Sequence, residues 1–183
     1  MKHALILYSG GIDSTTALFW ARGRFGRLSL LTFDYGQRHR IEVRVASELP
    51  ERLGIPHKFM AVDLTQIGGS ALTDSGLQLP EYSAVEEIEG GLPVTYVPFR
   101  NGIFLSLGAA WAEVIDARDI VCGFNIVDSP NYPDTRRAFV TAMEEAINTG
   151  TRAAFEPGRF TLHAPFIDMT KSEIIKAGLE LGA

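Results

Sequence analysis

The sequence predicts an α/β fold of the three-layer, Rossmann-like class, in which helices cover both faces of a parallel sheet. Short apolar runs without polar alternation recur along the chain, as is typical of strands buried on both faces. Segments with helical spacing separate these runs, which indicates right-handed strand-helix-strand crossovers. The chain has 183 residues, of which 46% are hydrophobic, so we expect a single domain over residues 1–183.

The first half of the chain alternates three predicted strands with two predicted helices. The apolar strands are expected over 4–8, 28–33 and 57–62. Apolar residues recur at helical spacing over 14–22 and 41–53. Glycines follow both of these segments, so each is predicted to be a helix with a defined end.

The second half begins with an insertion. Residues 63–97 are rich in Gly, Ser, Pro and Glu and show little periodicity, which predicts a long insertion with mobile parts. Beyond it, the pattern predicts helices over 103–114 and 139–147 and strands over 119–124 and 161–166.

The charge balance argues against a nucleic-acid partner. Seventeen Lys and Arg against 22 Asp and Glu give a net charge of −5, which disfavours a polyanion, so we expect a small-molecule partner. The single cysteine, Cys122, cannot form an intramolecular disulfide or a cysteine-rich zinc site, and it suits the reducing cytoplasm. No stretch approaches the ~18 apolar residues of a membrane span, so no membrane association is expected.

A glycine-rich loop joins the first predicted strand to the first predicted helix. The loop, Ser9–Ser14, reads SGGIDS and lies at the sheet edge where open parallel sheets bind ligands. Its glycines let the backbone approach an anion, and its hydroxyls and the N–H groups of the helix start can donate to phosphate oxygens. The carboxylate of Asp13 repels phosphate by itself, so it needs either a metal ion such as Mg²⁺ or a hydrogen-bonding role at this place. A tight turn with a Ser or Asp helix cap is the alternative.

Polar residues also gather at the ends of other predicted elements. The segments 33–39 and 123–134 follow strands, and the segment 96–102 precedes a helix. An ordinary turn is the alternative for the first segment, and a capped helix with a solvated Arg100 is the alternative for the last. Because all three segments are expected at one edge of the sheet, their convergence favours a binding site.

The last predicted helix brings a cation to the same region. Thr170 and Glu173 have the spacing of a capping box, which places Lys171 in the first helical turn. A lysine there opposes the helix dipole unless it meets an anion. We expect Lys171 to contact a phosphate, and a solvated side chain is the alternative.

The loop at Ser9–Ser14 resembles the PP-loop of the ATP pyrophosphatases. It lacks the Gly-Lys-Ser/Thr ending of a Walker A loop, and it is not a Gly-x-Gly-x-x-Gly fingerprint. The resemblance implies an adenine nucleotide alpha hydrolase-like fold. It also implies that ATP is cleaved between its α and β phosphates, with the substrate adenylated and pyrophosphate released.

A wider set of motifs carries a more specific resemblance over nearly the whole chain. The motifs are SGGIDS at 9–14, DYGQRH at 34–39, YVPFRN at 96–101, GFN at 123–125, Asp128, YPD at 132–134 and Thr170-Lys171. Together they resemble the QueC family of 7-cyano-7-deazaguanine synthases. The resemblance implies a homodimeric, ATP-dependent carbon–nitrogen ligase that converts 7-carboxy-7-deazaguanine and ammonia to 7-cyano-7-deazaguanine in queuosine biosynthesis. ATP would activate first the carboxylate and then the amide, so no nucleophilic side chain is needed.

The resemblance also implies roles for individual residues. The ATP site would consist of Ser9, Gly10, Gly11, Ile12, Asp13, Ser14, Thr15 and Lys171. The substrate site would consist of Tyr35, Gln37, Arg38, Arg100, Asn101, Gly123, Asn125, Asp128, Tyr132 and Asp134. The residues expected to act in catalysis are Asp13, Ser14, Lys171 and Arg100. Lys171 would neutralise developing charge and Arg100 would orient the substrate carboxylate. Asp128 or Asp134 would accept from the N–H edge of the substrate.

The chain departs from the family pattern at two places. Thr135 stands where the family has a cysteine after Tyr-Pro-Asp, so no thiol is present there. The family also carries a four-cysteine zinc site near its C-terminus, and this chain has no such cysteines. Either the sequence stops before this segment or the protein is a variant that lacks the metal. We expect the first, with Zn²⁺ in the full-length family member and its ligands beyond Ala183, none of them in this sequence.

Two other functions remain open. One is a PP-loop enzyme that modifies tRNA directly, although the negative net charge argues against it. The other is a nucleotide-binding module without turnover, or a QueC-like protein that acts on a protein partner. Substrate-dependent release of pyrophosphate separates these alternatives.

Overall fold

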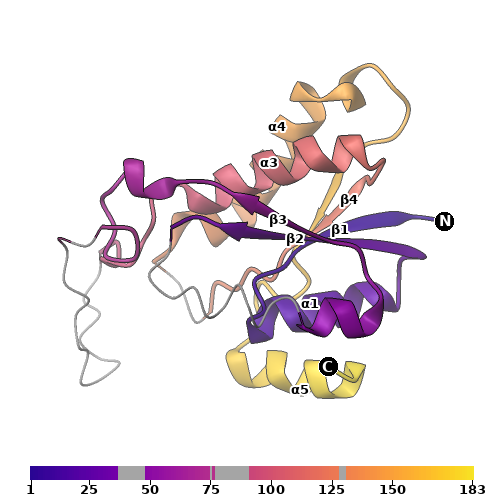
Figure 1. The fold of residues 1–183 in the computed structure, drawn as a ribbon, viewed down its shortest axis with the longest axis horizontal. Helices are drawn as coiled ribbons and strands as arrows, with labels where there is room; N and C mark the ends of the chain where they lie inside the picture. The colour runs from indigo at the N-terminus through magenta and orange to yellow at the C-terminus, as the bar shows by residue number, and fades with distance from the viewer. Residues whose placement is uncertain (37–47, 75, 77–90, 128–130) are drawn as a thin grey trace.

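The fold is that of a computed structural model, which describes residues 1–36, 48–74, 76, 91–127 and 131–183 (Figure 1). Five strands form one parallel sheet in the order β3-β2-β1-β4-β5. The strands are β1 His3–Leu7, β2 Arg27–Asp34, β3 His57–Ala61, β4 Asp119–Val121 and β5 Thr161–His163. The chain builds the sheet outward from β1, first to β2 and β3 on one side and then to β4 and β5 on the other. The crevice at the carboxyl ends of β2, β1 and β4 is therefore the switch point at which open sheets bind ligands.

Helices cover both faces of this sheet (Figure 1). One face carries α1 Ile12–Arg22 and α5 Lys171–Leu181, and the other carries α3 Arg100–Val114 and α4 Arg137–Gly150. Short 3-10 helices are η1 Leu64–Gln66, η3 Pro133–Thr135 and η4 Arg152–Ala154. Of the helix predicted over 41–53, residues 48–53 are helical, and the rest lies outside the described residues. Among the helices that the structure describes, none is long and apolar enough to cross a membrane.

β1 explains why the strands lack polar alternation. Leu5 packs with Leu105 in the core beneath α3 and α4, whereas Ile6 packs with Leu18 and Ile174 in the core beneath α1 and α5. Both β1 side chains are 0% exposed. Burial on both faces therefore selects apolar residues at successive positions, and the predicted parallel sheet is confirmed.

Two strands end earlier than the apolar pattern predicts. β4 ends at Val121 and β5 ends at His163, whereas the apolar runs continue to Phe124 and Phe166. These two phenylalanines leave the sheet but still pack against the core on opposite faces. An apolar pattern reports burial rather than pairing between strands, so it does not locate the end of a strand.

The described ends of the insertion at 63–97 pack together. Leu64, Ser70 and Ala71 are buried, and the N–H of Ala71 donates to the carbonyl of Val94 at 2.9 Å. Residues 75 and 77–90 lie outside the described residues, so the expectation of mobile parts stays a prediction.

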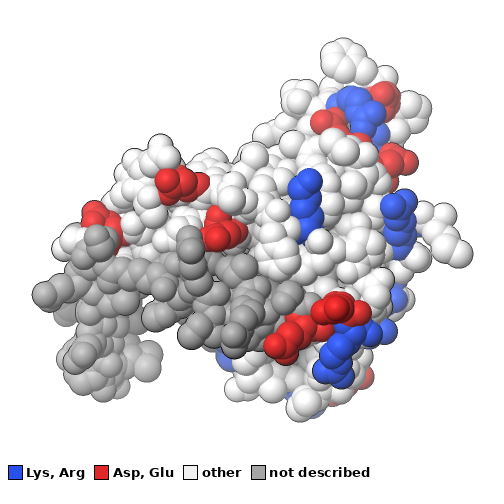
Figure 2. All heavy atoms as spheres, in the orientation of Figure 1, with Lys and Arg blue, Asp and Glu red and all other residues white. Residues whose placement is uncertain are grey.

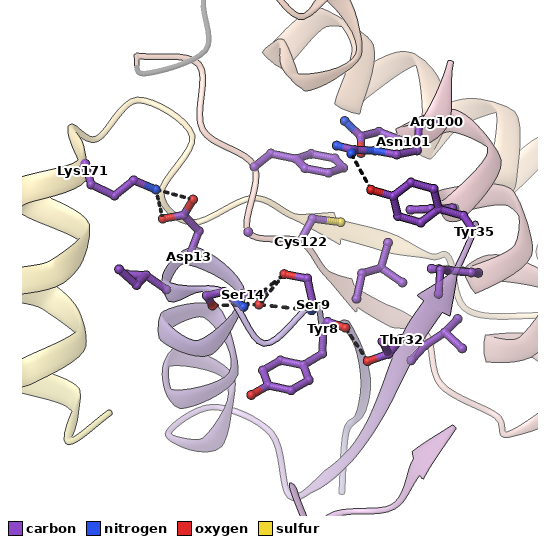
Figure 3. A pocket seen from close by; sticks show the side chains of 18 residues that line it. Tyr8, Ser9, Asp13, Ser14, Thr32, Tyr35, Arg100, Asn101, Cys122 and Lys171 are labelled. Carbon is purple, nitrogen blue, oxygen red and sulfur yellow. Dashed lines mark hydrogen bonds and ion pairs between the residues drawn. The ribbon is translucent and has the colours of Figure 1, made fainter. Parts of the chain in front are cut away.

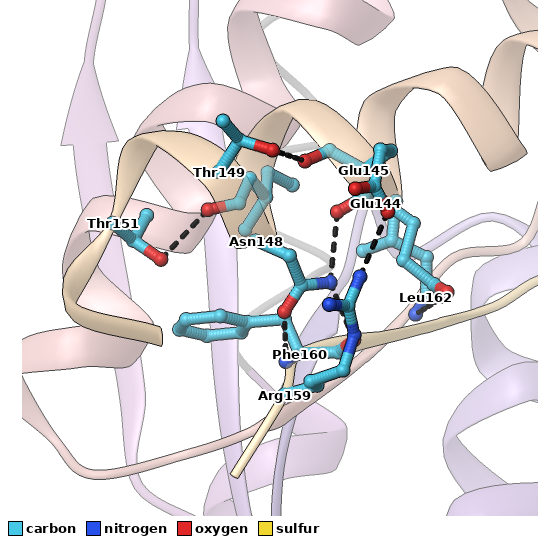
Figure 4. Close-up of polar contacts among 9 residues, drawn as sticks. Glu144, Glu145, Asn148, Thr149, Thr151, Arg159, Phe160 and Leu162 are labelled. Carbon is cyan, nitrogen blue, oxygen red and sulfur yellow. Dashed lines mark hydrogen bonds and ion pairs between the residues drawn. The ribbon is translucent and has the colours of Figure 1, made fainter. Parts of the chain in front are cut away.

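Side chains of α4 cover the free edge of the sheet beside β5 (Figure 4). Asn148 accepts from the N–H of Phe160 at 2.7 Å and donates to its carbonyl at 2.9 Å, and Glu144 accepts from the N–H of Leu162 at 2.7 Å. The N–H of the intervening Thr161 points the other way, toward β4. The backbone groups of Phe160 and Leu162 that bind Asn148 and Glu144 are therefore those that face away from the sheet. This contact fixes α4 and blocks pairing with another strand.

Candidate functional site

A cavity of about 440 Å³ opens at the carboxyl ends of β1, β2 and β4. Figure 3 shows its two sides. Asp13 and Lys171 lie on one side, and Tyr35 and Arg100 lie on the opposite side, with Cys122 between them. The cavity therefore occupies the switch point of the sheet, as the strand-end motifs predicted.

The backbone of the loop at Ser9–Ser14 forms the first wall. Gly10 has a φ of 83°, which glycine adopts without strain. Gly11 is the N-cap residue of α1 and provides no side-chain hydrogen bond to the helix start. Among the described residues no side chain caps the first-turn N–H groups of α1, which are therefore oriented for an anion.

The two serine hydroxyls of this loop hydrogen-bond within the loop itself. Ser14 Oγ donates to the carbonyl of Gly11 at 3.0 Å and lies 3.1 Å from Ser9 Oγ. Because the Ser14 proton is used on Gly11, Ser9 is the donor between the two hydroxyls. Both protons therefore hold the shape of the loop, and a hydroxyl can donate to a phosphate only after it rotates.

An ion pair joins the two helices that meet at this wall. Lys171 Nζ donates to both carboxylate oxygens of Asp13 at 2.7 Å (Figure 3). The side chains are 44% and 27% exposed, respectively. Lys171 is placed by the capping box of α5, in which Thr170 accepts from the N–H of Glu173 and Glu173 accepts from the N–H of Thr170. The predicted capping box is confirmed, and the phosphate contact of Lys171 stays a prediction.

Aromatic rings and one guanidinium form the opposite wall. Phe33 and Phe104 stack with their ring centroids 4.1 Å apart and an angle of 8° between the planes. Arg100 lies over the ring of Tyr35, with 5.7 Å from Cζ to the centroid, and its Nη1 donates to the Tyr35 hydroxyl at 3.4 Å. This wall offers flat apolar surface and a planar cation, which together suit an aromatic carboxylate.

A side-chain relay supports the floor of the cavity at its β2 end. Thr32 Oγ1 donates to the carbonyl of Tyr8 at 2.5 Å and lies 2.8 Å from His57 Nε2. With its own proton used, Thr32 accepts from His57. Burial lowers the pKa of His57, which favours the neutral ring. The relay ties β3 and β2 to the residue that precedes the glycine-rich loop.

The floor at β4 consists of Cys122 and Gly123. Cys122 is a buried free thiol, and burial raises its pKa to about 12, so it is protonated and does not act as a nucleophile. A Cβ on Gly123 would lie 2.8 Å from the backbone of Asp13 and Ser14. Glycine is therefore required at this position so that the loop after β4 can pack against the loop after β1.

The structure brings most of the described candidate residues to the cavity. Those that line it are Ser9, Gly11, Ile12, Asp13, Ser14, Lys171, Tyr35, Arg100, Asn101 and Gly123. Those that are described but are not part of the lining are Gly10, Thr15, Asn125, Tyr132 and Asp134. Gln37, Arg38 and Asp128 lie outside the described residues. The roles assigned to individual residues stay predictions.

The candidates that miss the lining make contacts within the protein. The Asn125 amide donates to the carbonyl of Met169. The hydroxyls of Tyr132 and Thr95 lie 2.7 Å apart. The Asp134 carboxylate accepts from the backbone N–H of Asn101 at 3.0 Å. These three polar side chains therefore connect the segments around the cavity to one another.

The strand-end motifs missed several lining residues. Phe33 and Phe124 lie within the predicted segments 33–39 and 123–134, and the lining residues outside all of the predicted segments are Leu7, Tyr8, Leu31, Thr32, Phe104 and Cys122. Most of them are the last residues of strands or follow a strand directly, and their apolar character makes them look like core. Their position at the carboxyl ends of three adjacent strands was the signal that could have found them.

The metal-ligating capacity of the described residues is small. No group of three or more His, Cys, Asp or Glu that could hold a metal ion is found in the described part of the chain. Asp13 is the acidic side chain of the cavity lining. It fits a Mg²⁺ ion that takes its other ligands from phosphates and water, and it does not fit a resident metal held by protein ligands alone.

Comparison with known proteins gives the family. Residues 3–183 match the family model described as queuosine biosynthesis protein QueC. A curated 7-cyano-7-deazaguanine synthase of Pseudomonas syringae pv. tomato is 47% identical over 182 residues, which cover 99% of this chain and 78% of the relative. Another, of Paramagnetospirillum magneticum, is 48% identical over 183 residues, which cover 100% of this chain and 80% of the relative.

Solved structures of lower identity share the fold. A 4-thiouridine synthetase in complex with RNA and ATP has a TM-score of 0.58 at 21% identity, over 99% of this chain and 41% of that one. A predicted subunit of a tRNA methyltransferase from Methanocaldococcus jannaschii has a TM-score of 0.60 at 15% identity, over 98% of this chain and 75% of that one. At these identities the likeness concerns the fold alone, and the predicted Rossmann-like class is confirmed.

Proposed function

The chain belongs to the QueC family of queuosine biosynthesis proteins, and from this membership we propose that it is an ATP-dependent 7-cyano-7-deazaguanine synthase. Its substrates would be 7-carboxy-7-deazaguanine and ammonia, and its product the 7-nitrile. The observation that carries the proposal is one cavity with two chemically different walls. An anion-binding loop lies on one side, and a guanidinium with stacked aromatic rings lies on the other.

The loop wall suits the phosphates of ATP. The left-handed Gly10 and the uncapped start of α1 present backbone N–H groups, and Lys171 adds a cation beside them. Asp13 would take part in holding Mg²⁺ once Lys171 turns to the phosphates. When bound, ATP supplies the leaving group that a carboxylate lacks. Lys171 and the N–H groups would stabilise negative charge that develops there.

The aromatic wall suits the deazaguanine. The rings of Tyr35 and Phe104 provide surface on which a flat heterocycle can lie. The guanidinium of Arg100 is the cation of this wall and would orient the substrate carboxylate toward the loop. No nucleophilic side chain is required, which agrees with the protonated thiol of Cys122.

The tRNA alternative receives no support from the visible charges. On the face shown in Figure 2, the described Lys and Arg side chains lie at separate places on the right of the view rather than in one patch. Binding to a nucleic acid needs several basic side chains on one face. The net charge of −5 and the family membership support our proposal of a small-molecule substrate without a nucleic-acid partner.

Three further properties are carried from the family as proposals. They are a homodimer, a cytoplasmic location and Zn²⁺ in the full-length protein. Light scattering on a sizing column tests the dimer, and metal analysis of the full-length protein tests the zinc.

The central experiment incubates the purified full-length protein with ATP, Mg²⁺, ammonium and 7-carboxy-7-deazaguanine. Mass spectrometry follows the amide and the nitrile, and a coupled assay follows pyrophosphate. We expect both products from the wild type. Lys171→Met and Asp13→Asn should lower kcat/KM by about 100-fold or more, because each removes a charge at the phosphate end.

Lys176→Met is the matched control, because Lys176 is an exposed lysine of the same helix. It should leave the rate unchanged. Bound ATP without amide or nitrile in the wild type would contradict the proposed substrate. Pyrophosphate released only when tRNA is added would favour the tRNA-modifying alternative.

A further inference from the structure

Arg100 owes its place on the cavity wall to an unusual backbone turn. It is the first residue of α3, and the residue before it, Phe99, has φ 54° and ψ 24°. A bulky side chain in this left-handed region is strained. Phe99 is also 53% exposed, so burial of its ring does not explain why the strained conformation is kept.

Contacts on both sides of Phe99 hold the turn. The backbone N–H of Phe99 donates to the Tyr96 hydroxyl at 3.0 Å. Its ring lies over Gly102, where a Cβ would come within 2.3 Å of a ring atom. The ring also meets the edge of Phe139, with centroids 6.0 Å apart. The turn is therefore held by a hydrogen bond to Tyr96 and by packing of the Phe99 ring against Gly102 and Phe139.

Asp134 fixes the next residue of α3. The N-cap position of this helix provides no side-chain hydrogen bond, and Asp134 supplies one from a distant part of the chain. Its Oδ2 accepts from the N–H of Asn101 at 3.0 Å, and its carbonyl accepts from the Asn101 side-chain amide at 3.2 Å. Asp134 is itself held in η3, where the Thr135 hydroxyl donates to the carbonyl of Tyr132 at 2.9 Å.

The carboxylate of Asp134 is kept at an energetic cost. The residue is 3% exposed, and its Oδ1 has no hydrogen-bond partner among the described residues. An unpaired buried carboxylate oxygen is unfavourable, so its presence calls for a compensating role. The charge of Asp134 also lies at the N-terminus of α3, where the helix dipole favours an anion.

We propose that Asp134 is a positioning residue that acts through Arg100. Together with Tyr96 and Phe99 it locks the first turn of α3, and this lock directs the Arg100 guanidinium to the Tyr35 side of the cavity. The proposal rests on the proposed function, in which Arg100 orients the substrate carboxylate. It assigns Asp134 a different role from the direct substrate contact that the sequence motif indicates.

The geometry favours this role over direct binding. Asp134 is not part of the cavity lining, whereas Arg100 and Asn101 are. Both hydrogen bonds between Asp134 and α3 are made with Asn101, the neighbour of Arg100. Loss of the carboxylate would therefore reach the substrate only by moving the start of α3.

A double-mutant cycle tests the proposal in the full-length enzyme. The proteins are the wild type, Asp134→Ala, Arg100→Gln and the double variant, and kcat/KM is measured for 7-carboxy-7-deazaguanine. We expect Asp134→Ala to lower kcat/KM by about 10- to 100-fold through misplacement of Arg100. In the R100Q background the same change should lower kcat/KM by less than about twofold, because there is no guanidinium left to position.

Asp134→Asn is the conservative variant. Its side-chain oxygen can still accept from the N–H of Asn101, so we expect it to recover most of the loss. Glu145→Gln is the neutral control, because Glu145 is exposed and its ion pair with Arg159 involves neither α3 nor Asp134. The affinity for ATP, measured by calorimetry, should be the same in the wild type and in Asp134→Ala.

Hydrogen exchange provides a readout that does not depend on turnover. Amides in the first turn of α3 should exchange faster in Asp134→Ala than in the wild type and Asp134→Asn. Equal losses of kcat/KM in both Arg100 backgrounds, or unchanged exchange in α3, would overturn the proposal. If the wild type makes no product, the proposed function fails instead, and the exchange of α3 alone decides whether Asp134 holds this turn.

Discussion

At the scale of single residues, Cys122 combines the properties of a core residue and a site residue. It is buried in the apolar core beneath α3 and α4, and it also lies on the cavity floor (Figure 3). Burial raises the pKa of the thiol to about 12. At about pH 8 the thiolate fraction is then about one in ten thousand, so Cys122 contributes a small, uncharged side chain to the cavity lining.

We expect Cys122 in the folded protein to resist iodoacetamide at about pH 8, because alkylation needs the thiolate and access. In concentrated guanidinium chloride the same thiol should react rapidly. The measurement is the mass of the intact protein over time, which is unambiguous because Cys122 is the single cysteine. Equal labelling rates in the two conditions would show that the thiol is not buried and that its pKa is not raised.

At the scale of elements, the packing of α5 on α1 brings the two charged residues of the loop wall together. Asp13 belongs to the first turn of α1, and Lys171 begins α5. Their helices approach closely at Gly178, where a Cβ would lie 2.8 Å from Thr16 Oγ1. Thr16 is buried and its branched side chain has little freedom to move. Gly178 therefore sets the distance between the helices that carry the ion pair.

Gly178→Ala should destabilise the protein by about 1–3 kcal/mol, because the added methyl group overpacks this contact. The free energy of unfolding from urea denaturation is the measurement. Gly150→Ala is the matched control, since nothing lies within 4 Å of a Cβ at the end of α4. It should be neutral or stabilise by about 0.5 kcal/mol. Equal effects of the two substitutions would contradict the close packing of α1 and α5.

At the scale of the whole molecule, the cavity joins strands and helices that come from both halves of the chain. β1, β2 and α1 contribute from the first half, and the segment after β4, α3 and α5 contribute from the second. A ligand that binds there contacts the folded state only. Binding should therefore stabilise the entire fold in proportion to its affinity and concentration.

We expect ATP with Mg²⁺ to raise the Tm by about 10 °C when it is present at about 1,000 times its Kd, which corresponds to about 4 kcal/mol. Chelation of Mg²⁺ should remove part of this rise. Lys171→Met should remove most of it, whereas Lys176→Met should retain it. The measurement is a thermal melt followed by calorimetry. An unchanged Tm in saturating ATP with Mg²⁺ would contradict an ATP site at this edge of the sheet.

The order of elements and the place of the site were predictable from local pattern. Strands buried on both faces, such as the one containing Leu5 and Ile6, require successive apolar residues, and this signal is visible without any long-range contact. The loop at Ser9–Ser14 was recognisable because tight turns and anion contacts need glycine and small polar residues at fixed spacing. The capping box at Thr170 was visible for the same reason, since it depends on neighbours in sequence.

The direction in which each polar side chain points depends on contacts between distant segments. Lys171 and Asp13 are separated by 158 positions and form one ion pair. Asp134 belongs to a motif that indicates substrate contact, yet the fold turns it toward Asn101. Cys122 and Thr32 look like core residues in the sequence, and the meeting of adjacent strand ends places them on the cavity floor. Spacing along the chain specifies local geometry, whereas these contacts arise only when the sheet brings the segments together.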